Sequence, residues 1–230
     1  MKSTMLITAA LLTAGLFFQS CDNSSSSSVK TDRDTTMSKM DHTDNMDMTN
    51  MSNEMPKSMT TMMAGMSALN MTGDFDLDYA NMMIPHHQSA VDMAQEYLPK
   101  AKDEKIKKMA QNIIDSQKKE IEELKTMIAN YKPAKTKTNA VAGHAAGEHN
   151  ELMETMNKMM DKMKGMKMSG DADKDFVLMM IPHHESAVTM AGDEISHGKN
   201  YELKKLSQKI IEDQNKELKD FNDWLANKKF

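Results

Sequence analysis

The stretch MMIPHHQSAVDMA spans residues 82–94 of this 230-residue chain and recurs, with two differences, as MMIPHHESAVTMA at residues 179–191. The second copy follows the first at a constant offset of 97 residues, as from His86 to His183. Each copy contains two adjacent histidines with methionines on both sides. Paired imidazoles and thioethers are therefore the chemistry that the two copies share.

The same register continues well outside the motif. Gly73 aligns with Gly170 before it, and Gln117 aligns with Gln214 after it, without a gap. A constant register over two long segments indicates one structural unit that is used twice.

The composition excludes some classes of function. The net charge is −5, so the chain lacks the excess of Lys and Arg with which proteins bind nucleic acid. Aromatic residues make up only 5%, which argues against base stacking as well. The outlier is methionine, with 28 residues beside 8 histidines and a single cysteine. Methionine fills gaps in protein cores, but that role does not explain methionines in polar segments.

The N-terminus has the features of a secretory signal, which we place at residues 1–20. Lys2 precedes an apolar run that is too short for a comfortable transmembrane helix. Cys21 follows the small Ser20, where a bacterial lipoprotein signal places its lipidated cysteine. We predict an exported protein of the cell envelope, anchored to a membrane by lipid on Cys21 and facing the periplasm or the exterior. The alternative is cleavage near Ser20 that leaves Cys21 free.

Residues 21–54 are predicted to form a disordered, methionine-rich tether. They consist mainly of Ser, Asp, Thr, Asn and Met, with almost no branched apolar residues. Methionine has no packing role in a segment that does not fold. The spacing of Met37, Met40, Met46 and Met48 favours a flexible metal scavenger, although compositional drift in a methionine-rich gene is the alternative.

Residues 55–132 are predicted to form a first repeat of three helices. The methionines between Met55 and Met66 fall at helical i, i+3, i+4 and i+7 steps, so they form one stripe. The motif lies on a second helix, which Pro85 should kink. A third helix, at about residues 102–130, carries Ile and Leu on one face and charged residues on the other.

The pattern then repeats after a linker, which we place at residues 133–148 because it is rich in Lys, Thr, Ala and Gly. Residues 149–230 again contain a methionine stripe, a motif helix and a helix with one apolar face. No segment alternates with period two, so we predict no sheet. The predicted fold is all-α, with two tandem three-helix repeats.

The spacing within the motif allows methionine and histidine to act together. Met82 and His86 are four residues apart, as are Met83 and His87, so each pair can approach one ion from one helix face. Met93 extends the stripe of His86. Adjacent histidines point about 100° apart on a helix, so they cannot easily share one ion. Either one histidine binds metal and the other supports it, or each serves a different site.

The candidate metal ligands are the histidines and methionines of both motifs and of the stripes before them. They are His86, His87, Met82, Met83, Met93, Met63 and Met66 in the first repeat, and His183, His184, Met179, Met180, Met190, Met160 and Met163 in the second. Gln117 and Glu120, repeated as Gln214 and Glu217, are candidates to hydrogen-bond the imidazoles from the third helix of each repeat. Equally, these four are plain surface residues.

These donors favour copper as the cofactor. Thioether with imidazole suits Cu(I), and the imidazoles also suit Cu(II). Zinc prefers Cys, His and carboxylate ligands, and calcium requires oxygen. Sites of methionine alone should bind copper over a wide pH range, whereas sites that need imidazole should weaken below about pH 6.

The methionine stripes also have the spacing of a helix core, and such a stripe is by itself more often core than ligand. Two adjacent histidines are likewise compatible with a hydrogen-bonded structural pair. The duplication of the motif and the methionine-rich tether favour metal binding.

The motif resembles the signature of a family of small secreted or periplasmic helical domains first catalogued as having unknown function. That signature, Met-Ile-x-His-His-x-x-Ala-x-x-Met-Ala, occurs here at residues 83–94 and 180–191. The resemblance covers about residues 60–130 and 155–227 and implies ferritin-like, up-and-down helical bundles. Some members of the family are periplasmic copper-binding proteins linked to copper tolerance. The resemblance implies this role here and carries over both histidine pairs with Met93 and Met190.

We therefore predict a copper-binding envelope protein that buffers, sequesters or delivers copper, and not an enzyme. Its expected partners are metal ions, the membrane and a copper exporter or oxidase. A structural or partner-binding bundle is the alternative. A ferritin-like di-metal oxidase is less favoured, because Glu194 and His197 form its Glu-x-x-His motif once, whereas the equivalent residues 97–100 contain no histidine.

Overall fold

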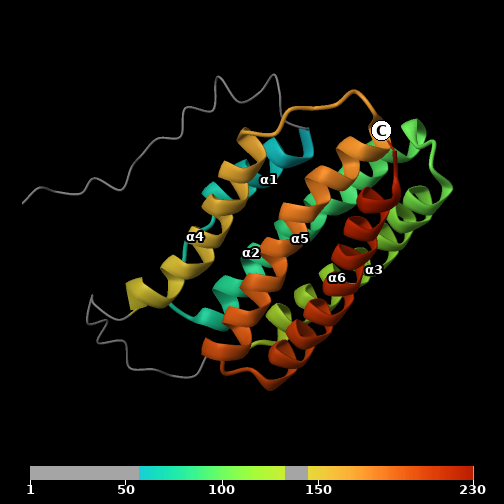
Figure 1. Cartoon of the computed structure of the whole chain (residues 1–230). Coiled ribbons are helices and arrows are strands. Elements are labelled where there is room, and N and C mark those ends of the chain that lie inside the picture. The colour runs from blue at the N-terminus through green and yellow to red at the C-terminus, as the bar shows by residue number, and fades with distance from the viewer. Residues whose placement is uncertain (1–56, 133–144, 230) are drawn as a thin grey trace, which may run out of the picture. The chain divides into compact units, whose positions relative to one another are not determined.

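A computed structural model describes residues 57–132 and 145–229, which form six α-helices and one short 3₁₀ helix (Figure 1). These are α1 (Lys57–Ser67), α2 (Phe75–Tyr97), η1 (Leu98–Lys100), α3 (Glu104–Asn130), α4 (Ala145–Lys164), α5 (Ala172–His197) and α6 (Tyr201–Asn227). No strand occurs in the two described ranges, and the prediction of an all-α helical bundle is confirmed.

Several predicted segments lie outside the described residues. They are the signal peptide, the Cys21 anchor, the tether and the greater part of the linker. α4 begins at Ala145, within the segment that the sequence suggested as a linker. The division into domains stays a prediction. In the described ranges, no helix has both the length and the apolar character needed to cross a membrane.

Each motif helix begins at an aspartate that is repeated between the two halves. Asp74 caps α2 and Asp171 caps α5, and each carboxylate accepts a hydrogen bond from the backbone N–H three residues later. Gly73 and Gly170 precede these caps with φ of +81°, a conformation that favours glycine. The same turn therefore sets the start of both motif helices.

α2, α3, α5 and α6 form a four-helix bundle, and α1 and α4 pack on its α2 and α5 side (Figure 1). α2 and α5 are antiparallel, because Tyr97 near the end of α2 stacks on Phe176 near the start of α5, with 4.2 Å between ring centroids. α3 and α6 are antiparallel too, since Trp224 Nε1 near the end of α6 donates to Asp103 Oδ2 before α3 at 3.0 Å. The two repeats thus pack directly against each other.

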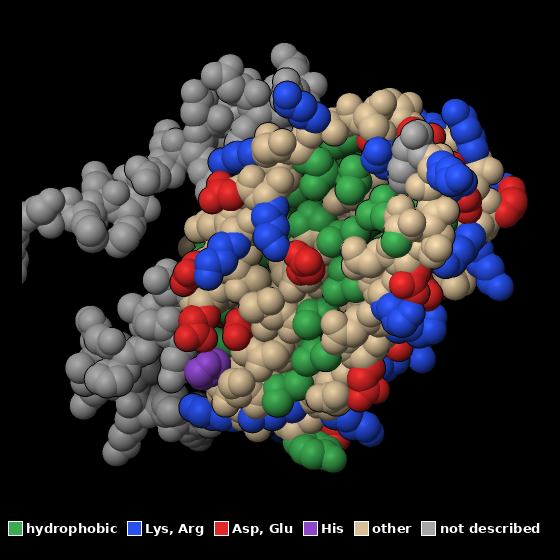
Figure 2. Space-filling model, viewed as in Figure 1, with side chains coloured by type: hydrophobic (Ala, Val, Ile, Leu, Met, Phe, Trp, Pro, Cys, Tyr) green, Lys and Arg blue, Asp and Glu red, His purple; other side chains and the backbone are tan. Residues whose placement is uncertain are grey.

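The core combines aliphatic residues of α3 and α6 with methionines of the other helices. Most described methionines of the two stripes are buried, with Met59 and Met160 at 0% exposure, whereas Met153 is 37% exposed. On the face shown in Figure 2, apolar side chains run along the middle of the molecule, with charged side chains beside them. Burying a methionine side chain contributes about 1.5–3 kcal/mol. The stripes therefore stabilise the fold whether or not they also bind metal.

Buried carboxyl groups join the ends of α2 and α5. Asp76 of α2 accepts hydrogen bonds from the backbone N–H groups of Lys199 and Asn200 at 2.8 and 2.9 Å. In the other repeat, Asp173 takes the equivalent place and accepts from Tyr97 Oη. Glu194 is the residue of the second repeat that aligns with Tyr97 of the first, and it lies beside Asp76.

Glu194 is fully buried, and neither carboxyl oxygen has a donor within the described residues. Burial, together with the neighbouring Asp76 carboxylate, raises the pKa of Glu194 to about 9. Glu194 is therefore protonated at neutral pH, beside the Asp76 carboxylate.

Glu194→Gln should stabilise the fold by an amount that grows with pH. The ordinary pKa of this carboxyl is 4.5 and the folded value is about 9, so between these limits folding takes up a proton. The stabilising effect of the neutral form is complete below about pH 4.5 and is lost toward pH 9, by up to about 1.4 kcal/mol per pH unit. Glutamine keeps a neutral donor without this proton.

Urea unfolding at several pH values measures the difference between the variant and the wild type. The matched control is Glu96→Gln, at an exposed position on α2. A difference that does not change between about pH 5 and about pH 8.5 would contradict a protonated Glu194.

Candidate metal centre

The two motifs meet at the centre of the bundle. His86 of α2 and His183 of α5 are fully buried, and their ring centroids are 3.9 Å apart with planes tilted by 44°. Each ring reaches the other repeat, because His86 Nε2 lies 2.7 Å from Ser186 Oγ and His183 Nε2 lies 2.7 Å from Ser89 Oγ. This reciprocal contact relates the repeats by a local two-fold axis.

The second histidine of each pair points to an outer helix. His87 Nε2 lies 3.0 Å from Glu120 Oε2 on α3, and His184 Nε2 lies 2.8 Å from Glu217 Oε2 on α6. The two glutamates are among the residues that the sequence suggested as partners of the imidazoles. Their role around a metal stays a prediction.

All four imidazoles share one hydrogen-bonding state. Each Nε2 faces an oxygen, and each Nδ1 is buried without a partner within the described residues. A carboxylate only accepts, so His87 and His184 donate through Nε2–H, and in a neutral ring the lone pair is then on Nδ1. The same tautomer is favoured at His86 and His183, because the other one would bury an N–H group that has no acceptor.

The central imidazoles are held in their neutral form. Burial lowers the pKa of His86 and His183 well below 6.5, and the neighbouring imidazoles act in the same direction. Neutral imidazole is the form that binds metal. Protons should therefore compete for these two rings only at a lower pH than the value of about 6 expected from the sequence.

Methionine sulfurs lie beside the central pair. Ser89 Oγ is 3.1 Å from Met62 Sδ of α1, and Ser186 Oγ is 3.0 Å from Met159 Sδ of α4. Each hydroxyl also contacts the carbonyl of the histidine three residues earlier. A thioether and an imidazole from different repeats thus converge on one serine.

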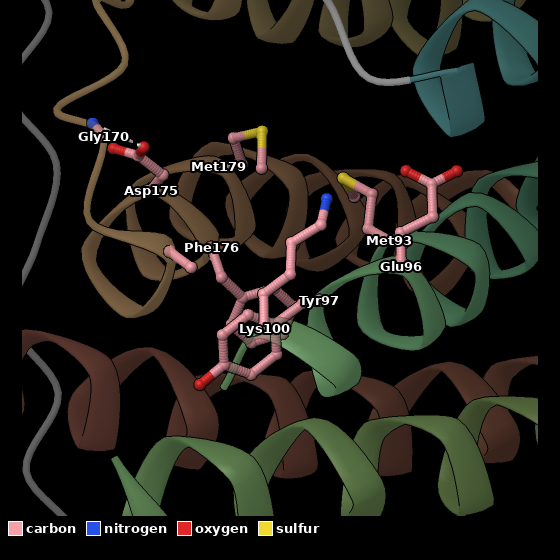
Figure 3. A pocket seen from close by; sticks show the side chains of 9 residues that line it. Met93, Glu96, Tyr97, Lys100, Gly170, Asp175, Phe176 and Met179 are labelled. Atoms are coloured by element: carbon pink, nitrogen blue, oxygen red, sulfur yellow. Dashed lines mark hydrogen bonds between the residues drawn. The ribbon is translucent and has the colours of Figure 1, made fainter. Parts of the chain in front are cut away.

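Most of the predicted ligands are buried. The buried methionines among them are Met63, Met66, Met82, Met83, Met93, Met160, Met163, Met180 and Met190. Met179 is only partly buried. It lines a pocket of about 360 Å³ with Met93 and Lys100, so this pocket brings together methionines of both repeats (Figure 3).

The sequence reasoning missed four residues of the centre. Met62 and Met159 belong to the stripes but were not among the candidate ligands, and Ser89 and Ser186 were not singled out. A signal was present, because each serine follows the first histidine by three residues in both copies.

Gln117 and Gln214 are buried, and their amide groups have no hydrogen-bond partner in the described part of the chain. Each lies one helical turn before the glutamate that contacts an imidazole, on the same face. Unpaired buried amides are costly, so a partner for these amide groups would stabilise the fold. Their predicted contact with the imidazoles stays a prediction.

A site of nitrogen and carboxylate ligands alone is not built here. Within the described residues, no three His, Cys, Asp or Glu side chains come together in an arrangement that could hold a metal ion. The thioethers of Met62 and Met159, which reach the same serines as the central imidazoles, are ligands that favour soft ions.

One family model, described as "Domain of unknown function (DUF305)", matches residues 22–128 and, a second time, residues 76–225. The chain belongs to the DUF305 family. The resemblance inferred from the histidine motif is thereby confirmed.

Solved DUF305-like structures were also found. CopM in the Cu(I)-bound form is 31% identical, and the match covers 66% of this chain and 96% of that chain with a TM-score of 0.48. A DUF305 fragment from Deinococcus radiodurans is 19% identical, covering 67% of this chain and 97% of that chain with a TM-score of 0.49.

A curated relative matches a shorter region. The uncharacterized protein L153 of Acanthamoeba polyphaga mimivirus is 42% identical over 53 residues, which is 23% of this chain and 35% of L153. The match thus spans about a third of the length of this relative.

Ser89→Ala should destabilise the fold by about 1–3 kcal/mol, because it leaves the buried Nε2–H of His183 without an acceptor. Urea unfolding measures the effect. The matched control is Ser196→Ala, which removes an exposed hydroxyl that donates to Gly192 O and should change stability by less than about 0.5 kcal/mol. If the two variants are equally stable, the reciprocal contact does not stabilise the bundle.

Proposed function

We propose that this DUF305 protein binds Cu(I) through its buried imidazoles and methionine sulfurs, and that it buffers, sequesters or delivers copper in the cell envelope. The observation that carries the proposal is the set of four buried Nδ1 atoms without hydrogen-bond partners. A buried polar atom without a partner costs free energy, and a metal ion bound to its lone pair removes that cost.

The spacing of the methionines in each motif supports such a site. Side chains on a helix point back toward the preceding turn, so the rings of His86 and His87 point toward the turn that contains Met82 and Met83. An Nδ1 lone pair and a thioether four residues earlier can therefore bind the same ion. Met179 and Met180 stand in the same relation to the second histidine pair.

The glutamates support this arrangement from the outer helices. A metal-binding histidine usually donates its other N–H to a carboxylate, which fixes the tautomer and makes the ligand more basic. His87 has this contact with Glu120, and His184 has it with Glu217. The central rings use the hydroxyls of Ser186 and Ser89 instead, and the sulfurs beside those hydroxyls add further soft donors.

Residues near the N-terminus support the proposed envelope location. A signal-like leader is followed by Cys21 and a polar, methionine-rich segment. An exported protein cannot rely on free thiols, since these oxidise outside the cytoplasm. Thioethers form no disulfides and so are suitable ligands for a soft ion in that compartment.

Replacing all four motif histidines with glutamine should lower the affinity for Cu(I) by about 100-fold or more. Glutamine keeps an N–H donor for the serines and glutamates but removes the ring Nδ1. Anaerobic titration against a competing Cu(I) chelator measures affinity, and circular dichroism measures helix content. His197→Gln is the matched control, because His197 is partly exposed and pairs with Glu151, away from the central rings.

A folded variant that binds Cu(I) as tightly as the wild type would refute this function. The buried methionine stripes would then act as core alone, and the chain would be a structural or partner-binding bundle. A variant that loses helix content would be replaced by the two single-repeat pairs of substitutions.

A further inference from the structure

The two histidine–glutamate pairs differ in one partner. Glu120 uses both carboxylate oxygens, because Oε2 contacts His87 and Oε1 accepts a hydrogen bond from Lys209 Nζ at 2.8 Å. Lys209 comes from α6 in the other repeat. Glu217 contacts His184 but forms no ion pair with a lysine or arginine within the described residues.

The Glu120 side chain is more buried than that of Glu217. The Glu120 side chain is 3% exposed, whereas that of Glu217 is 18% exposed. Burial would lower the pKa of the Lys209 ammonium group, but its contacts with Asp213 and Glu120 raise it, so Lys209 is charged at neutral pH.

The register of α3 against α6 shows which residue faces the glutamate in each repeat. The helices are antiparallel, with Lys209 opposite Glu120. In this register, Glu217 on α6 lies level with Asn112 on α3. Asn112 is also the residue that aligns with Lys209 in the 97-residue repeat. The duplicated position is thus a lysine in one repeat and an asparagine in the other.

This difference changes how each site attracts a cation. At His184, the full carboxylate charge of Glu217 makes the imidazole a stronger ligand. At His87, the ammonium group of Lys209 offsets the charge of Glu120 and also repels a bound cation. The Glu120 carboxylate and the His87 imidazole separate the Lys209 ammonium group from a cation bound at His87. At an effective dielectric constant of about 20, a positive unit charge at this separation lowers the binding constant of the cation by about tenfold.

We propose that Lys209 makes the two duplicated copper sites unequal, so that the His184 site fills before the His87 site. Lys209 acts through Glu120 and does not itself touch the imidazole. The inference rests on the proposed function, since it concerns the affinity of the same sites. A chain with two graded affinities can retain one ion while it exchanges the other.

Single-site proteins test this directly. In a His184→Gln background the His87 site keeps its imidazole and the His184 site does not, and there Lys209→Gln should raise the Cu(I) affinity by about tenfold. Lys209→Arg keeps the charge and should leave the affinity low. Lys205→Gln, an exposed lysine on the same helix, is the matched control and should change nothing.

The reciprocal change should act in the opposite direction. In a His87→Gln background, Asn112→Lys places a lysine level with Glu217 and should lower the Cu(I) affinity of the His184 site by about tenfold. A purely structural role of Lys209 would not produce this gain and loss. If the wild type binds Cu(I) but neither change moves the affinity, the inference is wrong and the proposed function stands. If the wild type binds no Cu(I), the proposed function itself fails.

Discussion

The reciprocal contact between the histidines and serines of α2 and α5 is the interaction on which the other features depend. Four imidazoles are buried in a bundle of fewer than two hundred described residues, and burying them is unfavourable unless their nitrogens are paired. His86 and His183 pair through serines of the opposite repeat, so they fix the register of the two motif helices. Their neighbours then face outward and meet glutamates on α3 and α6.

The pairing is incomplete, and the incompleteness gives the site its chemistry. Every Nε2 is used to hold a ring in place, which leaves every Nδ1 buried without a hydrogen-bond partner among the described residues. In each histidine, Nε2 therefore forms the structural contact, whereas Nδ1 has no partner in the described residues. The methionines show the same double use, since they fill the core and also bring sulfur to the central serines.

The sequence predicted the helices and their buried faces because periodicity reports which side of a helix avoids water. The spacing of the motif's histidines and methionines likewise indicated that they lie on one helix. It did not predict which buried faces meet, because a stripe does not identify its partner. The contact of His86 with Ser186 joins residues that are 100 positions apart, and Met62 rather than Met63 reaches Ser89. Such choices depend on tertiary packing, which is also why Glu194 beside Asp76 could not be recognised as an acid pair.

The protonation state of the ring nitrogens tests the central claim most directly. Nitrogen-15 NMR of the metal-free protein should show a proton on Nε2 of all four motif imidazoles, and neutral rings at His86 and His183. Adding Cu(I) should shift the Nδ1 signals and leave the Nε2 protons in place. A proton on Nδ1 of His86 or His183, or Nδ1 signals that do not respond to saturating Cu(I), would contradict the account.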